Sequence, residues 1–278
     1  MWWWQNRVQN DEKGDCAVSF GVGDIQVKER CLDALLADVR EAFQDFEVYE
    51  AWTSSFLRKK MAREGYVYPS LEELLEELSE AGFADVVIMP THLTPGEEFQ
   101  RKIVPGAEAF SDRFGSLHVM EPVFTVKSAE DFAFLTGEVL GLSQLAEDEE
   151  MVFMGHGSPH QHNPAYELLQ QYADSRGWQV HIGVVEPEDY PNKEDVLKRL
   201  TARGVRRVYL RPLLLAGGNH ALHDLAGDEP ESWKSVLHGA GFDVRCSTKG
   251  LGEYAAFRNL YVQKLKSIAD LSFDNQKL

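Results

Sequence analysis

Two histidine-bearing loops, each following an apolar run typical of a β-strand, carry the residues of this chain best placed for chemistry. The first is MVFMGHGSPHQH at 151–162, with His156 between two glycines, and the second is VYLRPLLLAGGNHALHD at 208–224, with His220 after a Gly-Gly-Asn turn. Open α/β sheets bind ligands at the edge where parallel strands end. A neutral imidazole there can accept a proton or bind a transition metal, and flanking glycines would let a flat ligand approach the backbone. We therefore predict that both histidines are functional.

A third strand end supplies a carboxylate. Glu186 closes the apolar run IGVV at 182–185 and precedes a proline. Two imidazoles and one carboxylate suit a divalent transition metal that must be held loosely, although no local spacing motif links the three residues. His160 and His162 are the alternative ligands, but they lie on a polar loop directly before an Asn-Pro pair typical of a helix start. We expect the site to consist of the first two histidines and Glu186.

Further candidates lie in the first half of the chain. His92 follows the apolar run 85–89 and is a candidate for the wall of a cleft. The acidic pairs Glu97-Glu98 and Asp228-Glu229 are interpreted as solvated helix starts, which the helix dipole favours.

Composition excludes several classes of function. The 278 residues include 45 acidic and 28 basic ones, and the net charge of -17 argues against nucleic acid or an anionic membrane as a partner. The three cysteines, Cys16, Cys31 and Cys246, are widely separated and predict neither a disulfide framework nor a CxxC metal site. No segment has the length of a signal-peptide core or a membrane span. We expect a soluble cytoplasmic protein, and leave its oligomeric state open, a homo-oligomer included.

The elements that must position these residues alternate between strands and helices. Apolar runs predict strands over 17–20, 46–52, 85–89, 151–154, 179–185, 208–215 and 242–246. Helical spacing predicts helices over 32–43, from Leu71, from Pro164, and over 193–202, 233–237 and 254–268. The helix at Leu71 has a capping box formed by Ser70 and Glu73. This βαβ alternation predicts an α/β fold with parallel sheets.

The two halves of the chain are similar in sequence. SFGVG at 19–23 can be laid on FMGHG at 153–157, and 86–98 on 208–220, which places Val22 opposite His156 and Glu98 opposite His220. The similarity predicts two doubly wound α/β domains, over 1–140 and 141–278, with most of the metal-site residues in the second. The last helix can pack back on the first domain. A ligand cleft would lie between the domains, lined by strand-end loops from both.

Taken together, these motifs resemble the anaerobic cobalt chelatases, the sirohydrochlorin cobaltochelatases of cobalamin biosynthesis, which are class II chelatases related in fold to ferrochelatase. The resemblance extends from Val18 to about Leu265. It rests on MGHG at 154–157, VVEPEDYP at 184–191, PLLLAGGNHALHDLAGDEPESWKS at 212–235 and KGLGE at 249–253, supported by VSFG at 18–21 and PTHLTPGEEF at 90–99. The chain departs from the family at Val22 and Ser55, in an insertion at 187–189, and in the Trp2–Trp4 leader.

The resemblance implies a chelatase-like fold and a set of roles. His156, Glu186 and His220 would surround the metal: His156 as base or as metal-delivering ligand, Glu186 as proton acceptor or cation guide, and His220 completing the transient coordination. The expected reaction inserts Co²⁺ into sirohydrochlorin, with Fe²⁺ or Ni²⁺ as alternatives, and needs no cofactor. A sirohydrochlorin ferrochelatase and a non-catalytic metal- or tetrapyrrole-binding protein are the competing interpretations.

The implied substrate carries many carboxylates, as does the protein, so the cleft needs a local cationic rim. The candidates for this rim are Arg58, Lys59, Lys60, Arg211 and Lys249. Of these we assign Lys249, together with His92, to substrate binding.

Overall fold

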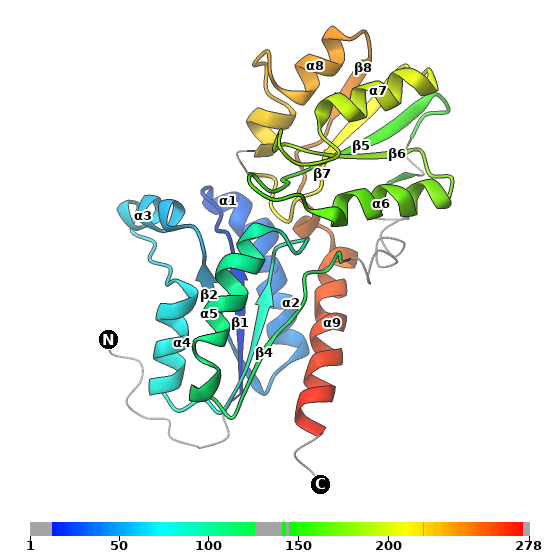
Figure 1. Ribbon diagram of the computed structural model, residues 1–278. Helices are drawn as coiled ribbons and strands as arrows, with labels where there is room; N and C mark the ends of the chain where they lie inside the picture. The colour runs from blue at the N-terminus through cyan, green and yellow to red at the C-terminus, as the bar shows by residue number, and fades with distance from the viewer. Residues whose placement is uncertain (1–12, 126–140, 143–144, 219, 275–278) are drawn as a thin grey trace.

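The computed structural model describes residues 13–125, 141–142, 145–218 and 220–274 (Figure 1). The Trp2–Trp4 leader and the segment 128–140 lie outside these residues, and the predicted domain boundary between residues 140 and 141 stays a prediction. Among the described residues, no helix combines the length and apolarity that a membrane span requires.

Two parallel sheets of the same topology organise the described chain (Figure 1). The first contains β1 (Lys13–Ser19), β2 (Phe46–Trp52), β3 (Asp85–Pro90) and β4 (Ser116–Val119) in the order β2-β1-β3-β4. The second contains β5 (Glu149–Gly155), β6 (Val180–Val184), β7 (Arg207–Pro212) and β8 (Asp243–Cys246) in the order β6-β5-β7-β8. This confirms the predicted fold class. The half-buried edge strand β4 was not predicted.

Helices cover both faces of each sheet. They are α1 (Ile25–Lys28), η1 (Glu29–Asp33), α2 (Ala34–Ala42), α3 (Ser55–Arg63), α4 (Leu71–Glu80), η2 (Phe99–Ile103), α5 (Val104–Glu108), η3 (Ser111–Arg113), α6 (Pro164–Ser175), α7 (Lys193–Arg203), η6 (His220–Leu225), α8 (Trp233–Gly239), η7 (Leu251–Glu253) and α9 (Ala255–Asp274). The predicted capping box of Ser70 and Glu73 opens α4. The predictions missed α1, α3, η2, α5, η3 and η7.

Alternating side chains along the strands divide the core into layers. In the first sheet, Cys16 and Val18 face α4 and α5, whereas Ala17 faces α2. In the second sheet, Val152 and Met154 face α7 and α8. The apolar cluster that contains Ala17 and α2 also contains residues of the second sheet, of α6 and of α9. The two halves therefore share part of their core.

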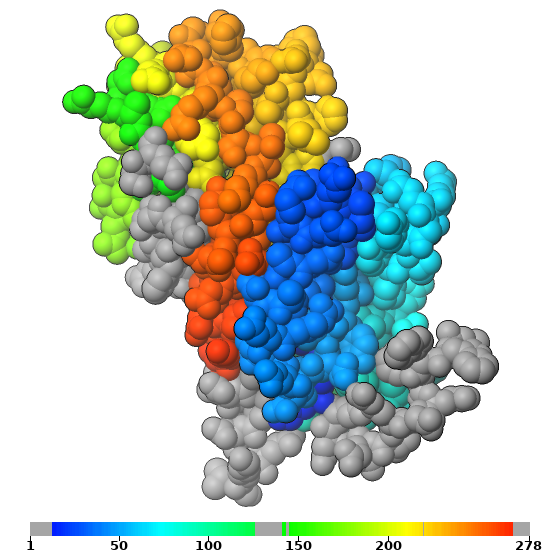
Figure 2. Space-filling model, turned by 180° about the vertical axis from the view of Figure 1, so that it is seen from behind, coloured from blue at the N-terminus to red at the C-terminus, as the bar shows by residue number. Residues whose placement is uncertain are grey.

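The last helix lies against the first half of the chain. Arg258 of α9 pairs with Asp38 of α2 at 2.7 Å, and the Tyr261 hydroxyl donates to the Thr91 carbonyl at 3.1 Å. Viewed from behind, α9 runs alongside α1, η1 and α2 (Figure 2). α9 therefore connects the second sheet to the residues that follow β3.

The strand registers show how the two halves correspond. Pro90 of β3 pairs with Val18 of β1, and Pro212 of β7 pairs with Met154 of β5. The next residue after each proline donates its N–H to the same strand partner, at 2.8 Å in both halves. The predicted match of Pro90 with Pro212 therefore agrees with the structure.

The predicted match at the first strand of each half is wrong by two residues. Since Val18 corresponds to Met154, the residue equivalent to His156 is Phe20 and not Val22. The glycines that follow these two residues, Gly21 and Gly157, both have positive φ, +109° and +83°. The overlay of SFGVG on FMGHG had instead aligned Gly21 with Gly155. Matching residue types alone does not distinguish a glycine within a strand from one in the left-handed region.

The strand predicted over 208–215 ends at Pro212. Residues beyond it leave the sheet and bond to η7: Leu251 N donates to Leu214 O, and Gly252 N to Leu215 O. A Cβ on Gly217 would lie 1.9 Å from the Thr248 carbonyl, so this close approach of two backbones requires glycine. The contact determines where the loop carrying His220 begins.

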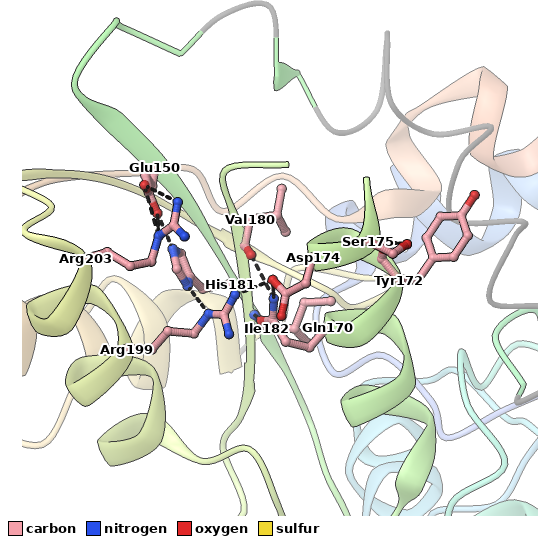
Figure 3. A network of polar contacts seen from close by, with 10 residues as sticks. All are labelled: Glu150, Gln170, Tyr172, Asp174, Ser175, Val180, His181, Ile182, Arg199 and Arg203. Carbon is pink, nitrogen blue, oxygen red and sulfur yellow. Dashed lines mark hydrogen bonds and ion pairs between the residues drawn. The ribbon is translucent and has the colours of Figure 1, made fainter. Parts of the chain in front are cut away.

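An ionic network fastens the second sheet to its helices (Figure 3). Glu150 of β5 accepts from the Arg203 guanidinium at 2.9–3.2 Å and contacts Nε2 of buried His181, while Arg199 donates to Nδ1 of His181 at 2.9 Å and pairs with Asp174. Because Nδ1 accepts, His181 carries its proton on Nε2. Burial lowers the pKa of His181. Burial alone would raise the pKa of Glu150, but the hydrogen bonds from His181 and Arg203 outweigh it and hold that pKa at about 2.

Candidate functional site

A cavity of about 550 Å³ lies where strand ends of the two sheets meet. Its wall comes from four loops, each following the carboxyl end of a strand: 19–22 after β1, 91–102 after β3, 156–160 after β5 and 213–220 after β7, together with Tyr166 of α6. These are the two central strands of each sheet. The predicted binding region, formed by strand-end loops from both halves, is thus present in the structure.

His156 and His220 face each other in this cavity. Their ring centroids are 4.8 Å apart and the ring planes lie at 85°. Nδ1 of His156 is 3.2 Å from the Gly157 carbonyl oxygen, and Nδ1 of His220 is 2.5 Å from an Asp224 carboxylate oxygen. Both contacts are to acceptors, so in the neutral form of each ring Nδ1 carries the proton and the Nε2 lone pair is available.

The environment keeps His156 neutral. Burial lowers its pKa, and neighbouring His220 lowers it further, whereas the Gly157 carbonyl and the carboxylates of Glu186 and Asp224 act in the opposite direction. A neutral imidazole can accept a proton or bind a cation at ordinary pH. Asp224 was not predicted as the partner that orients His220; its i,i+4 spacing on a helical turn was the available signal.

Glu186 lies beside His156 but outside the cavity lining. Its Oε1 is 3.9 Å from Nδ1 of His156, and its backbone N–H donates to the His156 carbonyl at 3.0 Å. Glu186 is absent from the residues that line the cavity. Within the described ranges, no three His, Cys, Asp or Glu side chains are grouped closely enough to hold a metal ion. The structure thus brings Glu186 close to His156 without forming the predicted three-residue ligand set.

The two residues assigned to substrate binding are placed differently. His92 lines the cavity, and both of its ring nitrogens are buried and lack a hydrogen-bond partner among the described residues. Burial lowers the pKa of His92 to about 4, against the opposing effect of Glu98. Lys249 is exposed outside the cavity lining, with Nζ 3.8 Å from the centroid of the Tyr254 ring.

The other cations suggested for a rim also lie outside the cavity lining. Arg58 pairs with Glu73 at 2.7 Å, Lys60 donates to the Gly23 carbonyl at 2.8 Å, and Arg211 is buried and bonded to the Tyr254 hydroxyl at 2.6 Å. Lys59 also does not contribute to the lining.

Two unpredicted cations, Arg101 and Lys102, do line the cavity. Each pairs with the glutamate four residues earlier, Glu97 or Glu98, at 2.7 Å. These glutamates do begin a helical segment, as interpreted, but they are not fully solvated: both line the cavity, and each has one buried carboxylate oxygen without a partner among the described residues. The reason is topological, since the turn carrying them follows the carboxyl end of β3.

The glycines around His156 do not open the backbone to a flat ligand. A Cβ on Gly155 would lie 2.4 Å from the Tyr166 ring, and a Cβ on Gly157 would lie 2.9 Å from Val184. The Tyr166 hydroxyl is 3.4 Å from Thr94 Oγ1 and 3.5 Å from Gly157 N. The glycines therefore allow tight internal packing that fixes His156.

The segment 187–189 contains a residue that holds the histidine loop in place. Buried Asp189 accepts from the N–H groups of Ser158 at 2.9 Å and Asn163 at 3.0 Å, and its carboxylate lies 2.9 Å from Nδ1 of His162. His160 lines the cavity.

Comparisons with known proteins show the family of the chain. The family model described as cobalt chelatase (CbiK) matches residues 13–270. A sirohydrochlorin cobaltochelatase of Salmonella typhimurium is 29% identical over 265 residues, covering 95% of this chain and 98% of that protein. The sirohydrochlorin cobaltochelatase CbiKC of Nitratidesulfovibrio vulgaris is 30% identical over 265 residues, covering 94% and 92%.

Solved structures share the fold at lower sequence identity. SirB from Bacillus subtilis, solved with Fe³⁺, has a TM-score of 0.60 at 15% identity, covering 96% of this chain and 98% of its own. CbiX, described as the terminal enzyme for siroheme biosynthesis in denitrifying bacteria, has a TM-score of 0.58 at 17% identity, covering 91% and 98%.

Proposed function

This chain belongs to the cobalt chelatase (CbiK) family, and we propose that it inserts Co²⁺ into sirohydrochlorin, a polycarboxylated reduced tetrapyrrole. The observation that carries the proposal is the pair of facing imidazoles, His156 and His220, in a cavity built from the strand ends of both sheets. Two curated relatives named for this activity match nearly the whole chain. The metal ion and the tetrapyrrole are both substrates in this reaction. A cytoplasmic location fits the three free cysteines.

Insertion requires removal of two N–H protons from the macrocycle while a divalent cation approaches its four nitrogens. A flat ring hides the nitrogen lone pairs within its plane, so a site that holds a bent ring lies closer to the transition state. Apolar side chains such as Phe20, Leu93 and Leu214 line the cavity and suit the faces of the ring.

The position of each site residue indicates its role in metal insertion. Nε2 of His156 accepts the two ring protons in turn and passes each to solvent, or it delivers the metal, because Nδ1 is already directed at the Gly157 carbonyl. The Glu186 carboxylate, 3.9 Å from Nδ1, stabilises His156 once it is protonated or attracts the incoming cation. Asp224 orients His220 so that its Nε2 can coordinate the metal transiently. Neutral His92 lies in the cavity wall, where it can contact the substrate.

The donor set fits weak, exchangeable metal binding. Imidazole and carboxylate ligands accept several divalent metals, and their affinity order follows the metal more than the site. We propose Co²⁺ as the physiological metal on the basis of the family, with Fe²⁺ and Ni²⁺ as the alternatives that a metal series must distinguish.

Anaerobic incubation of the full chain with sirohydrochlorin and each metal tests the proposal through the absorption change of the macrocycle. We expect the highest rate with Co²⁺ and a loss of about 100-fold or more in His156→Ala, since a positioned base contributes at least this factor. His238→Ala, an exposed histidine on α8, is the matched control. Failure of the wild-type chain to insert any metal would refute the proposal, as would a His156→Ala rate equal to that of the control.

Glu186→Gln and His220→Ala test whether these two residues act on the metal ion and not on the macrocycle. We expect either change to lower the rate and weaken its dependence on Co²⁺ concentration, while the affinity for metal-free sirohydrochlorin changes little. A large loss of tetrapyrrole affinity with unchanged metal dependence would show that these residues bind the macrocycle instead.

A further inference from the structure

Among the cavity-lining side chains in the described chain, Arg101 and Lys102 alone carry a permanent positive charge. They follow each other on η2. Their partners Glu97 and Glu98 have 17% and 27% of their side chains exposed, whereas 60% of Arg101 and 50% of Lys102 is exposed. The carboxylates are thus seated in the wall, and the cations extend from them toward solvent at the cavity edge.

Each cation has donors to spare. A lysine ammonium has three N–H donors and an arginine guanidinium has five, and the pair with each glutamate involves Nζ of Lys102 and Nη1 of Arg101 at 2.7 Å. Exposed i,i+4 pairs contribute little to stability. The cations can therefore bind a second carboxylate without a large rearrangement.

The chain holds η2 next to the histidine loop. Gln161 Nε2 donates to Gln100 Oε1 at 2.8 Å, and Asn163 Nδ2 donates to Thr94 Oγ1 at 2.9 Å. These bonds join the segment after β3 to the segment after β5. The two cations therefore have a defined position relative to His156.

We propose that Arg101 and Lys102 form the carboxylate-binding edge of the cavity and each hold a peripheral carboxylate of the macrocycle. This inference rests on the proposed function, which makes the ligand a polycarboxylated tetrapyrrole. A chain with a net charge of -17 repels such a ligand at long range. Two adjacent cations at the cavity edge provide local attraction and determine which edge of the ring enters first.

The test measures the affinity of metal-free sirohydrochlorin for Arg101→Met, Lys102→Met and the charge-conserving Lys102→Arg. We expect each charge-removing change to raise Kd about tenfold, the value of one charge-assisted hydrogen bond at a partly exposed site, and the conservative change to restore most of the affinity. Lys198→Met is the control: Lys198 is 78% exposed on α7, pairs with Asp195 at 3.6 Å and lies outside the cavity lining. Lys198→Met changes the net charge by the same amount as the test variants, so an effect of net charge alone on Kd would appear equally in this control.

A second arm compares an octacarboxylate with a dicarboxylate porphyrin as ligands. Lys102→Met should lose more affinity for the octacarboxylate than for the dicarboxylate. The Kd of this variant for the octacarboxylate should also depend less steeply on salt concentration than that of the wild type. Equal losses for both ligands, or affinities equal to that of Lys198→Met, would overturn the inference. If the wild type inserts cobalt in that case, the proposed function still stands; if the wild type binds no tetrapyrrole at all, both proposals fall.

Discussion

Asp15 is fully buried in the central strand β1, and neither of its carboxylate oxygens has a hydrogen-bond partner among the described residues. Burial raises the pKa of Asp15 from 3.8 to about 8, although Arg40 acts to lower it. Between these two values the folded chain keeps the proton while the unfolded chain loses it. The free energy of unfolding of the wild-type chain is therefore not reduced by Asp15 below pH 3.8, and it decreases as the pH rises toward 8.

Replacement of Asp15 by Asn removes this titration. One proton difference changes the free energy of unfolding by about 1.36 kcal/mol per pH unit. The stability of Asp15→Asn relative to wild type should therefore rise by about 2.7 kcal/mol from pH 5 to pH 7 and level off above pH 8. Urea titrations of both chains at pH 5, 6, 7 and 8 measure this difference.

Asp45→Asn, which removes a carboxylate at an exposed position before β2, is the control. A difference between Asp15→Asn and wild type that stays constant from pH 5 to pH 8 would refute the reasoning. It would mean that the buried carboxyl does not retain its proton in the folded state.

Three further predictions concern the site and its support. His156 should stay neutral on acidification to below the ordinary imidazole pKa of about 6.5, because burial and neighbouring His220 lower the pKa of His156; an NMR titration of the His156 ring with a midpoint above 6.5 would contradict this. Gly155→Ala should lower the free energy of unfolding by about 1–3 kcal/mol through the clash with Tyr166, and thermal unfolding that matches the wild type would exclude the clash. His181→Ala should cost about 2–4 kcal/mol by breaking the buried network, whereas the insertion rate per folded molecule should stay near wild type because the network lies outside the cavity lining.

Much of the fold was predictable because its signals are local. The capping box of Ser70 and Glu73 depends on four consecutive residues, and it opens α4 as expected. The run 46–52 predicted β2 with its observed bounds, since apolar and β-branched residues bounded by polar ones are sufficient to indicate a strand. Strand β4 was missed because its four half-buried residues, SLHV, give no such contrast.

Sequence and expected topology predicted which edge of the sheets carries the candidate site, but not its detailed geometry. Parallel strands end at one edge of a sheet, so His156 and His220 could be expected in the same region before any distance was known. The 4.8 Å distance between their ring centroids and the position of Glu186 beside His156 depend on how the loops fold back. Sequence order does not encode that path.

The tertiary structure alone decided which surrounding residues reach the cavity. Arg101 and Lys102 are indistinguishable in sequence from any solvated helical pair, and only the placement of η2 beside the histidine loop brings them to the cavity. The correspondence of Phe20 with His156 likewise emerged from strand register and from the positive φ of the following glycines. Local propensity determines which segments become strands and helices, whereas contacts between residues distant in the chain are set by packing, which no short stretch of sequence contains.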